Sequence, residues 1–308
     1  MLWALLAFTA AITNAAYYIG TKKFLFTIDP AVLAGGGFLF TSFSLLAISG
    51  IRGIPVLGPG FITAVLATTS LNIIATVLSF RAIRDTDVSL AVPMISFTPL
   101  FNILTAAVIL GELPNAPGVC GILIIVTGSY VLNTAKEHTR FSDPVRQMVT
   151  NPGVFAMLIV AFLYSVAINY DKMVMVNSDI TFGSGVVFFL LGSFFCGVSL
   201  MQRYLPVAVA GLPVLFRQET VTAAPLPHLN RRLLLPFLFI AAVITIEAFC
   251  INTAYSLQIV PYIISIKRMS LIMIVLYGAA VFHEKDVARR LTGTALMVLG
   301  AVIIVIFG

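Results

Sequence analysis

The feature that most constrains the fold is a series of apolar runs, each about 20 residues long. A helix of about 20 residues crosses the hydrocarbon core of a bilayer, which is about 30 Å thick, so each run is a candidate transmembrane helix. Lipid offers backbone groups no hydrogen-bonding partner, so the interiors of these runs are expected to be helical. We place the runs near 1–21, 31–50, 59–80, 88–110, 117–135, 152–172, 182–202, 233–255, 261–282 and 289–307.

Composition agrees with a chain whose solvent is partly lipid. Of the 308 residues, 60% are hydrophobic and only 10% are charged, whereas a soluble domain carries roughly 25% charge. The net charge is +6, but the basic residues are scattered through short loops, which argues against nucleic acid as a partner. The N-terminal run has no positive region before it, so we interpret it as a first spanning helix rather than a cleaved signal.

The two halves of the chain repeat each other. The offset is 172 residues at three matched positions late in each half, which are Glu112 and Glu284, Gly121 and Gly293, and Gly128 and Gly300. Near the start of each half the offset is 150, as between Lys22 and Lys172 and between Asp29 and Asp179. The difference, 172 − 150 = 22, is taken up by the long loop at 203–232. We therefore predict a first repeat at 1–136, a linker at 137–151 and a second repeat at 152–308.

Each predicted repeat has five spans, an odd number, so the second repeat must enter the membrane from the opposite side. Inverted repeats place a site at the interface of the two halves, and rocking between the halves exposes it to each side in turn. The predicted fold class is thus an all-α integral membrane protein, with ten transmembrane helices in two inverted five-helix repeats around a central cavity.

Two stretches carry a resemblance to a known family. The first half contains "LTAAVILGE" followed by two spaced glycines, and the second contains "ISIKRMSLIMIVLYGAAVFHE" followed by two more. With ten spans in two inverted fives, the chain resembles the drug/metabolite transporter superfamily, EamA branch. The resemblance implies a basket of ten helices that passes a small metabolite through a central cavity. Substrates in the superfamily include amino acids, sugar phosphates, nucleotide sugars and drugs.

The distribution of Lys and Arg predicts the orientation. The loops after odd-numbered spans hold 14 of these residues, whereas the other side holds Arg52 and, at a helix end, Lys172. The positive-inside rule therefore predicts cytoplasmic odd-numbered loops and both termini outside. We expect the protein in the plasma or inner membrane of the cell, as a monomer or a homodimer.

Lys267 and Arg268 are adjacent cations inside the ninth apolar run. Each costs roughly 2.5–3.5 kcal/mol at a helix centre, so both are expected to face the bundle interior or water, with an anionic partner. Glu247 lies about 12 Å deep in the eighth span and Lys267 about 9 Å deep in the ninth, measured from the same side at 1.5 Å per residue. We therefore expect contact between them across the helix pair.

Three roles for the basic pair stay open. One cation pairs with Glu247 while the other binds an anionic group of the substrate, as the Lys-Arg dipeptide of the similar triose-phosphate translocators does. Alternatively, the residues form a structural or gating ion pair, or lie near the rim and reach water. Glu247 is either a permanent partner of Lys267 or a proton-coupling site.

Other polar residues within spans are weaker candidates for substrate contact. Lys172 lies near a helix end and either lines the cavity or anchors the helix at the interface. Asn72 and Asn102 are mid-membrane amides that either line the cavity or hydrogen-bond a neighbouring helix. Pro93 and Pro99 each remove a backbone hydrogen bond and are expected to bend the fourth span.

Function follows from the architecture. We predict a secondary transporter of a small polar metabolite, anionic if the basic pair binds it, with efflux favoured by the resemblance alone. The alternatives are a translocase of a lipid-linked substrate and a non-transporting membrane subunit. We expect no enzyme, cofactor or metal, because the three histidines are single and far apart and form no HExxH pair.

Overall fold

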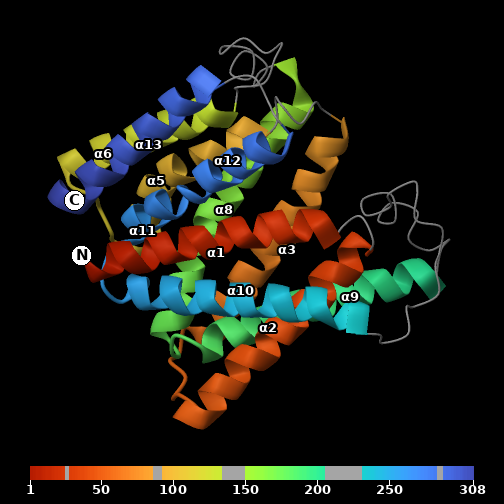
Figure 1. Ribbon diagram of the computed structural model, residues 1–308. Coiled ribbons are helices and arrows are strands. Elements are labelled where there is room, and N and C mark those ends of the chain that lie inside the picture. The colour runs from red at the N-terminus through yellow and green to blue at the C-terminus, as the bar shows by residue number, and fades with distance from the viewer. Residues whose placement is uncertain (25–27, 86–91, 134–149, 205–230, 283–286) are drawn as a thin grey trace.

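The computed structural model describes residues 1–24, 28–85, 92–133, 150–204, 231–282 and 287–308, and the regular structure among them is helical (Figure 1). The elements are α1 (Leu2–Phe24), α2 (Pro30–Arg52), α3 (Phe61–Asp85), the 3₁₀ helix η1 (Val92–Phe97), α5 (Thr98–Leu110), α6 (Ala116–Asn133), α8 (Pro152–Val176), α9 (Phe182–Tyr204), α10 (Arg231–Tyr255), α11 (Val260–Lys267), α12 (Ser270–Phe282) and α13 (Val287–Phe307). The predicted linker 137–151 and the loop 203–232 lie largely outside these residues.

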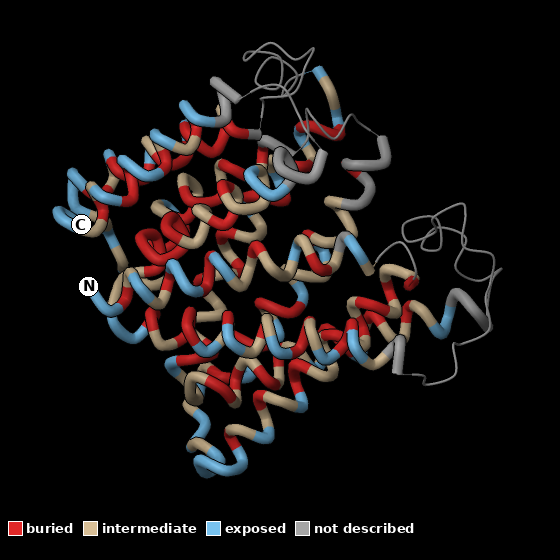
Figure 2. Tube along the Cα trace, viewed as in Figure 1, coloured by how far each residue is buried: buried red, intermediate tan, exposed pale blue. Residues whose placement is uncertain are grey.

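Within the described residues, 7 helices are long and apolar enough to cross a membrane. Three shorter apolar segments accompany them, at Met94–Leu110, Ala116–Leu132 and Leu291–Phe307. The prediction of several membrane-spanning helices is confirmed, while the count of ten spans stays a prediction. Figure 2 shows exposed residues on the outward faces of the helices, and many of them are large and apolar, such as Leu5, Phe43 and Val108. Such side chains suit contact with lipid tails.

Two helices begin with the capping chemistry that the sequence offers them. Asp29 precedes α2, and its carboxylate accepts hydrogen bonds from the backbone N–H groups of Ala31 and Val32 at 2.8 and 3.3 Å. Asn151 caps α8 in the same way. Proline follows at the first helical position in both, where its missing N–H costs nothing and its fixed φ suits the helix.

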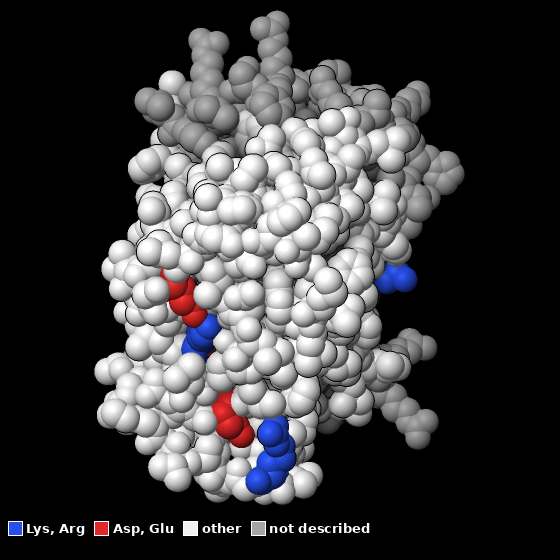
Figure 3. All heavy atoms as spheres, turned by 90° about the vertical axis from the view of Figure 1, so that its left-hand side faces the viewer, with Lys and Arg blue, Asp and Glu red and all other residues white. Residues whose placement is uncertain are grey.

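The helices pack in pairs that join distant parts of the chain. In Figure 1, α1 lies beside α10, α6 beside α13 and α2 beside α9, and α3 packs against α8. Both termini lie at the same end of the molecule, on the left in Figure 1. Figure 3 looks onto that end, which we call the termini-bearing end, and few charged side chains are visible there.

Glycines let α6 and α13 approach each other closely. A Cβ added at Gly121 would lie 2.8 Å from the carbonyl oxygen of Gly300, and one added at Gly300 would lie 2.6 Å from that of Gly121. Gly128 and Gly293 face each other in the same reciprocal way, at 2.7 and 2.9 Å. Small residues at helix crossings bring backbones together, and van der Waals packing then holds helices that lipid alone would not drive together.

The ninth apolar run, predicted as one span over 261–282, is interrupted at the basic pair. Helix α11 ends at Lys267 and α12 begins at Ser270. Between them, the N–H of Met269 donates to the carbonyl of Ile266 at 2.9 Å and that of Leu271 to Arg268 at 3.0 Å, which are i→i−3 bonds of a tightened turn. The candidate span Val260–Tyr277 runs across this tightened turn, which the sequence did not predict because no proline or glycine marks it.

The fourth run, predicted at 88–110, is irregular at the matching place, and its residues 88–91 lie outside the described part. The 3₁₀ helix η1 contains Pro93, and α5 begins at Thr98, one residue before Pro99. Proline removes a backbone donor, which accounts for the change of helix type. Thr98 and Ser270, the first residues of α5 and α12, are 270 − 98 = 172 positions apart.

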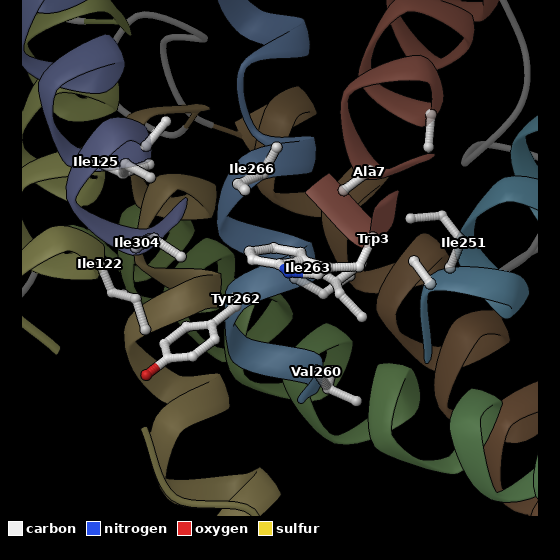
Figure 4. Close-up of a cluster of buried hydrophobic side chains, with 14 of the residues drawn as sticks. Trp3, Ala7, Ile122, Ile125, Ile251, Val260, Tyr262, Ile263, Ile266 and Ile304 are labelled. Atoms are coloured by element: carbon white, nitrogen blue, oxygen red, sulfur yellow. The ribbon is translucent and has the colours of Figure 1, made fainter. Parts of the chain in front are cut away.

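Helix α11 is held in the middle of the largest apolar cluster. Figure 4 shows Tyr262, Ile263 and Ile266 of α11 among side chains from α1, α6, α10 and α13. Trp3 stacks on Tyr262 with 6.3 Å between ring centroids, and the Tyr262 hydroxyl donates to Asn115 at 3.0 Å. This packing fixes α11 and therefore fixes where Lys267, its last residue, is presented.

Candidate substrate cavity

An ion pair joins α10 to α11 at the centre of the candidate site. Lys267 Nζ lies 2.6 Å from Glu247 Oε1, and the two side chains are 29% and 12% exposed. Asn14 of α1 donates its amide to both Glu247 oxygens, at 3.2 and 3.4 Å. Breaking such a pair leaves an uncompensated charge, which is strongly unfavourable in a membrane interior. Glu247 is therefore satisfied by an ammonium group and an amide together.

The ion pair lines a cavity of about 320 Å³. Specific pockets for small molecules fall in the range of about 300–1,000 Å³, so this volume suits a small metabolite. Helices α1, α2, α3, α8, α9, α10 and α11 all contribute to the wall. Its residues are Asn14, Tyr17, Phe38, Asn72, Ile168, Asp171, Val174, Ser184, Val187, Phe188, Leu191, Ile244, Glu247, Ala248, Ile251, Asn252, Tyr255, Ile264 and Lys267.

A second carboxylate enters the cavity from α8. Asp171 accepts a hydrogen bond of 2.5 Å from the Thr68 hydroxyl on α3, and Thr68 in turn accepts one of 3.1 Å from the Asn72 amide. Sequence reasoning noticed Asp171 only as the neighbour of Lys172 near a helix end. The available signal was an ionisable residue inside an apolar run, which marks a functional candidate by default.

The wall also includes an amide and a hydroxyl that no sequence pattern singled out. Asn252 of α10 donates to the backbone oxygen of Ile180 at 2.7 Å and to the Ser184 hydroxyl at 2.8 Å. Both line the cavity. They tie α10 to the start of α9 and leave polar atoms beside the wall.

Arg268 points elsewhere than Lys267. It is half-buried, it is not one of the described residues that line the cavity, and it interacts electrostatically with Tyr18 and Tyr164. Adjacent helical positions are about 100° apart, so this separation is expected of consecutive residues. Among the described residues, no carboxylate lies within ion-pair distance of Arg268.

Asn102 and Lys172 bridge helices rather than line the cavity. Asn102 is fully buried and donates to the backbone oxygen of Ser165 at 3.1 Å, which fastens α5 to α8. Lys172 pairs with Glu112 and donates to the backbone oxygen of Gln258 at 3.2 Å. Glu112 also accepts from the N–H of Val260 at 2.7 Å. Asn72 is thus the predicted amide that does line the cavity.

Comparisons with known proteins give a family match for the first part of the chain and a fold for the whole of it. The EamA-like transporter family model matches residues 1–134. No curated protein matches. Among 28 matching chains of solved structures, a crystal structure described only as that of a protein has a TM-score of 0.73 at 17% identity, covering 99% of both chains. That likeness concerns the fold alone. Residues 1–134 thus match the EamA-like transporter family of the drug/metabolite transporter superfamily, and the candidate spans among the described residues make this chain a multi-pass membrane protein.

Proposed function

We propose that this protein is a secondary transporter that moves a small polar metabolite by alternating access through the 320 Å³ cavity. The observation that carries the proposal is the wall itself, where the Lys267–Glu247 pair, Asp171 and several amides converge among apolar side chains. Concave, mostly apolar sites with a few convergent polar groups are the usual form of a ligand pocket.

Two inverted repeats, at 1–136 and 152–308, are part of the proposal. Support comes from packing that is reciprocal under the repeat. Gly121 meets Gly300 and Gly128 meets Gly293, and the offset of 172 exchanges these two contacts. The helices of the fourth and ninth runs also restart 172 residues apart, at Thr98 and Ser270. Interrupted helices at corresponding places of the two halves point to the binding site in transporters built from repeats.

Hydrogen bonds close the termini-bearing end. Glu112 joins Lys172 to the start of α11, and Asn115 joins Tyr262 to the carbonyl of Phe307. We propose that these ties break when the cavity opens toward this end. By the count of basic residues this end faces away from the cytoplasm, although most of the loops counted lie outside the described residues. Efflux is favoured by the family resemblance alone.

We assign direct substrate contact to Lys267, Glu247 and Asn72, and positioning of helices to Arg268, Asn102 and Lys172. A lipid-linked substrate would call for a lateral opening lined by apolar groups, with the basic pair near a headgroup. A non-transporting subunit would call for a packed, dry interior. The polar wall around Lys267 favours the small polar metabolite over both.

A thermal-shift screen of the detergent-purified protein against small metabolites tests the proposal. A ligand at 100 times its dissociation constant stabilises by about 2.7 kcal/mol. We expect hits for the wild type and for Arg52→Gln, which removes an exposed cation outside the cavity, and their loss in Lys267→Gln. Hits should also exchange across proteoliposome membranes. Equal stabilisation of Lys267→Gln, or binding without exchange, would contradict the proposal.

A further inference from the structure

The charge of the cavity is not balanced by its own residues. Its described wall contains two carboxylates, Asp171 and Glu247, and one ammonium group, that of Lys267. The formal charge of the wall is therefore 1 − 2 = −1. Arg268 does not offset it from within the wall, because it is not among the lining residues.

The imbalance is located at Asp171. Glu247 is occupied, since Lys267 lies 2.6 Å away and Asn14 donates to both of its oxygens. Among the described residues, Asp171 accepts one hydrogen bond, through Oδ1 from Thr68, and no cation lies within ion-pair distance of it. An ionised carboxylate has about four acceptor positions on two oxygens, so Asp171 retains capacity for a further donor.

Aromatic rings surround the same space. Tyr17, Phe38, Phe188 and Tyr255 line the cavity from α1, α2, α9 and α10. The negative face of an aromatic ring attracts ammonium groups, and the attraction grows when the site is shielded from water. A carboxylate with spare acceptor capacity together with several rings is the chemistry that recognises an organic ammonium ion.

We propose that the cavity selects substrates bearing an ammonium group, which Asp171 binds, while Lys267 stays paired with Glu247. This inference rests on the transport function proposed above and narrows its substrate class. It departs from the expectation of an anionic substrate, which required a basic residue free to bind one. Thr68 acts as a positioning residue, because its hydroxyl donates to the Asp171 carboxylate and itself accepts from Asn72.

A thiol placed in the wall can report the sign of the cavity's charge without a known substrate. Cys120, Cys196 and Cys250 are replaced by alanine in the full-length protein, and Ala248→Cys introduces one cavity thiol. A trimethylammonium-ethyl methanethiosulfonate and a sulfonato-ethyl methanethiosulfonate then compete as labels of similar size and opposite charge. The rate at which each reagent labels the protein is divided by the rate at which it reacts with free mercaptoethanol. The amount of reactive thiol in the protein is then measured after denaturation.

We expect the cationic label to be favoured by about tenfold, as in clefts that focus one sign of charge. Asp171→Asn keeps an acceptor for Thr68 and should lower the preference by roughly threefold or more, because it removes one of the charges that attract the cationic label. Lys267→Gln should raise the preference for the cationic label, because it removes the ammonium group from the wall. In addition, 2-phenylethylammonium should slow labelling, whereas 3-phenylpropanoate and 2-phenylethanol should not.

The outcomes separate the two proposals. Equal labelling by both reagents, a preference that Asp171→Asn leaves unchanged, or protection by 3-phenylpropanoate would overturn the ammonium inference and leave the cavity as a ligand site. If neither reagent labels a thiol that is present on denaturation, water does not reach the cavity, and both the inference and the transport function fall. The melting temperature of each variant shows whether it has folded.

Discussion

Adding one methyl group to Gly300 should push α13 away from α6. The Cβ of Gly300→Ala would lie 2.6 Å from the carbonyl oxygen of Gly121 and 3.0 Å from the backbone nitrogen of Ile125. Ordinary contact begins near 3.4 Å, so the backbones must separate by 3.4 − 2.6 = 0.8 Å along this line. The obstacle is backbone, which cannot rotate aside as a long side chain can.

The expected loss of stability is the difference between two effects. Overpacking of a close contact costs about 1–3 kcal/mol. Replacing glycine by alanine within a helix returns about 0.5–1 kcal/mol, because the unfolded chain loses conformational freedom. The difference spans about 0–2.5 kcal/mol, and its midpoint is a net destabilisation of about 1 kcal/mol, which lowers the melting temperature by roughly 2–4 °C. Gly128→Ala should behave similarly, since its Cβ would lie 2.7 Å from the carbonyl oxygen of Gly293.

The assay is thermal unfolding in one detergent, followed by the fluorescence of Trp3, the protein's single tryptophan. Trp3 belongs to the same apolar cluster as Ile304 of α13, so its signal reports this region. Gly197→Ala is the matched control, because a Cβ there would have no heavy atom within 4 Å. It should be neutral or slightly stabilising. If Gly300→Ala were as stable as Gly197→Ala, the close approach of α6 and α13 would be refuted.

Two further predictions concern the bridges between helices. Lys172→Met and Glu112→Gln should each destabilise the protein, the first by about 3 kcal/mol because it leaves a carboxylate unpaired. A double-mutant cycle measured by denaturation should give a coupling energy of at least about 0.5 kcal/mol. Additive losses of stability would contradict the pairing. Asn102→Leu should cost about 1 kcal/mol, the net contribution of one typical hydrogen bond, because the Ser165 carbonyl keeps Thr105 and Asn169 as donors. Asn72→Leu should instead reduce ligand-induced shifts in melting temperature more than stability, and the reverse ranking would contradict the assigned roles.

Sequence patterns predicted the membrane-spanning helices well, because spanning lipid requires long apolar helices whatever their neighbours are. They matched Gly121 with Gly293 and Gly128 with Gly300 as repeat positions, but they did not predict that these glycines pack against one another. The break between α11 and α12 was missed, since it arises from i→i−3 hydrogen bonds in a stretch with no proline or glycine. Tertiary packing around Tyr262 and Ile263 decides where this helix ends, and local propensity does not record such packing.

Sequence patterns also predicted part of the candidate site. Matching the depths of Glu247 and Lys267 along two neighbouring helices brought together residues that do form an ion pair. Depth alone could not say which residues face inward, because that depends on the rotation of each helix. Asn14 and Asn252 thus escaped notice, and Asp171 was noticed only as the neighbour of Lys172. Asn102 and Lys172 were chosen although they bond between helices instead.

The interrupted helix connects the architecture to the proposed chemistry. Because α11 ends at Lys267, the ammonium group leaves the last turn of a helix whose other residues are buried among apolar side chains. Arg268 begins the turn and is carried to another face, near Tyr18 and Tyr164. A continuous helix would also separate the two cations, because consecutive helical positions are about 100° apart. If the halves rock as proposed above, this tightened turn beside the cavity is where we expect the ninth span to bend.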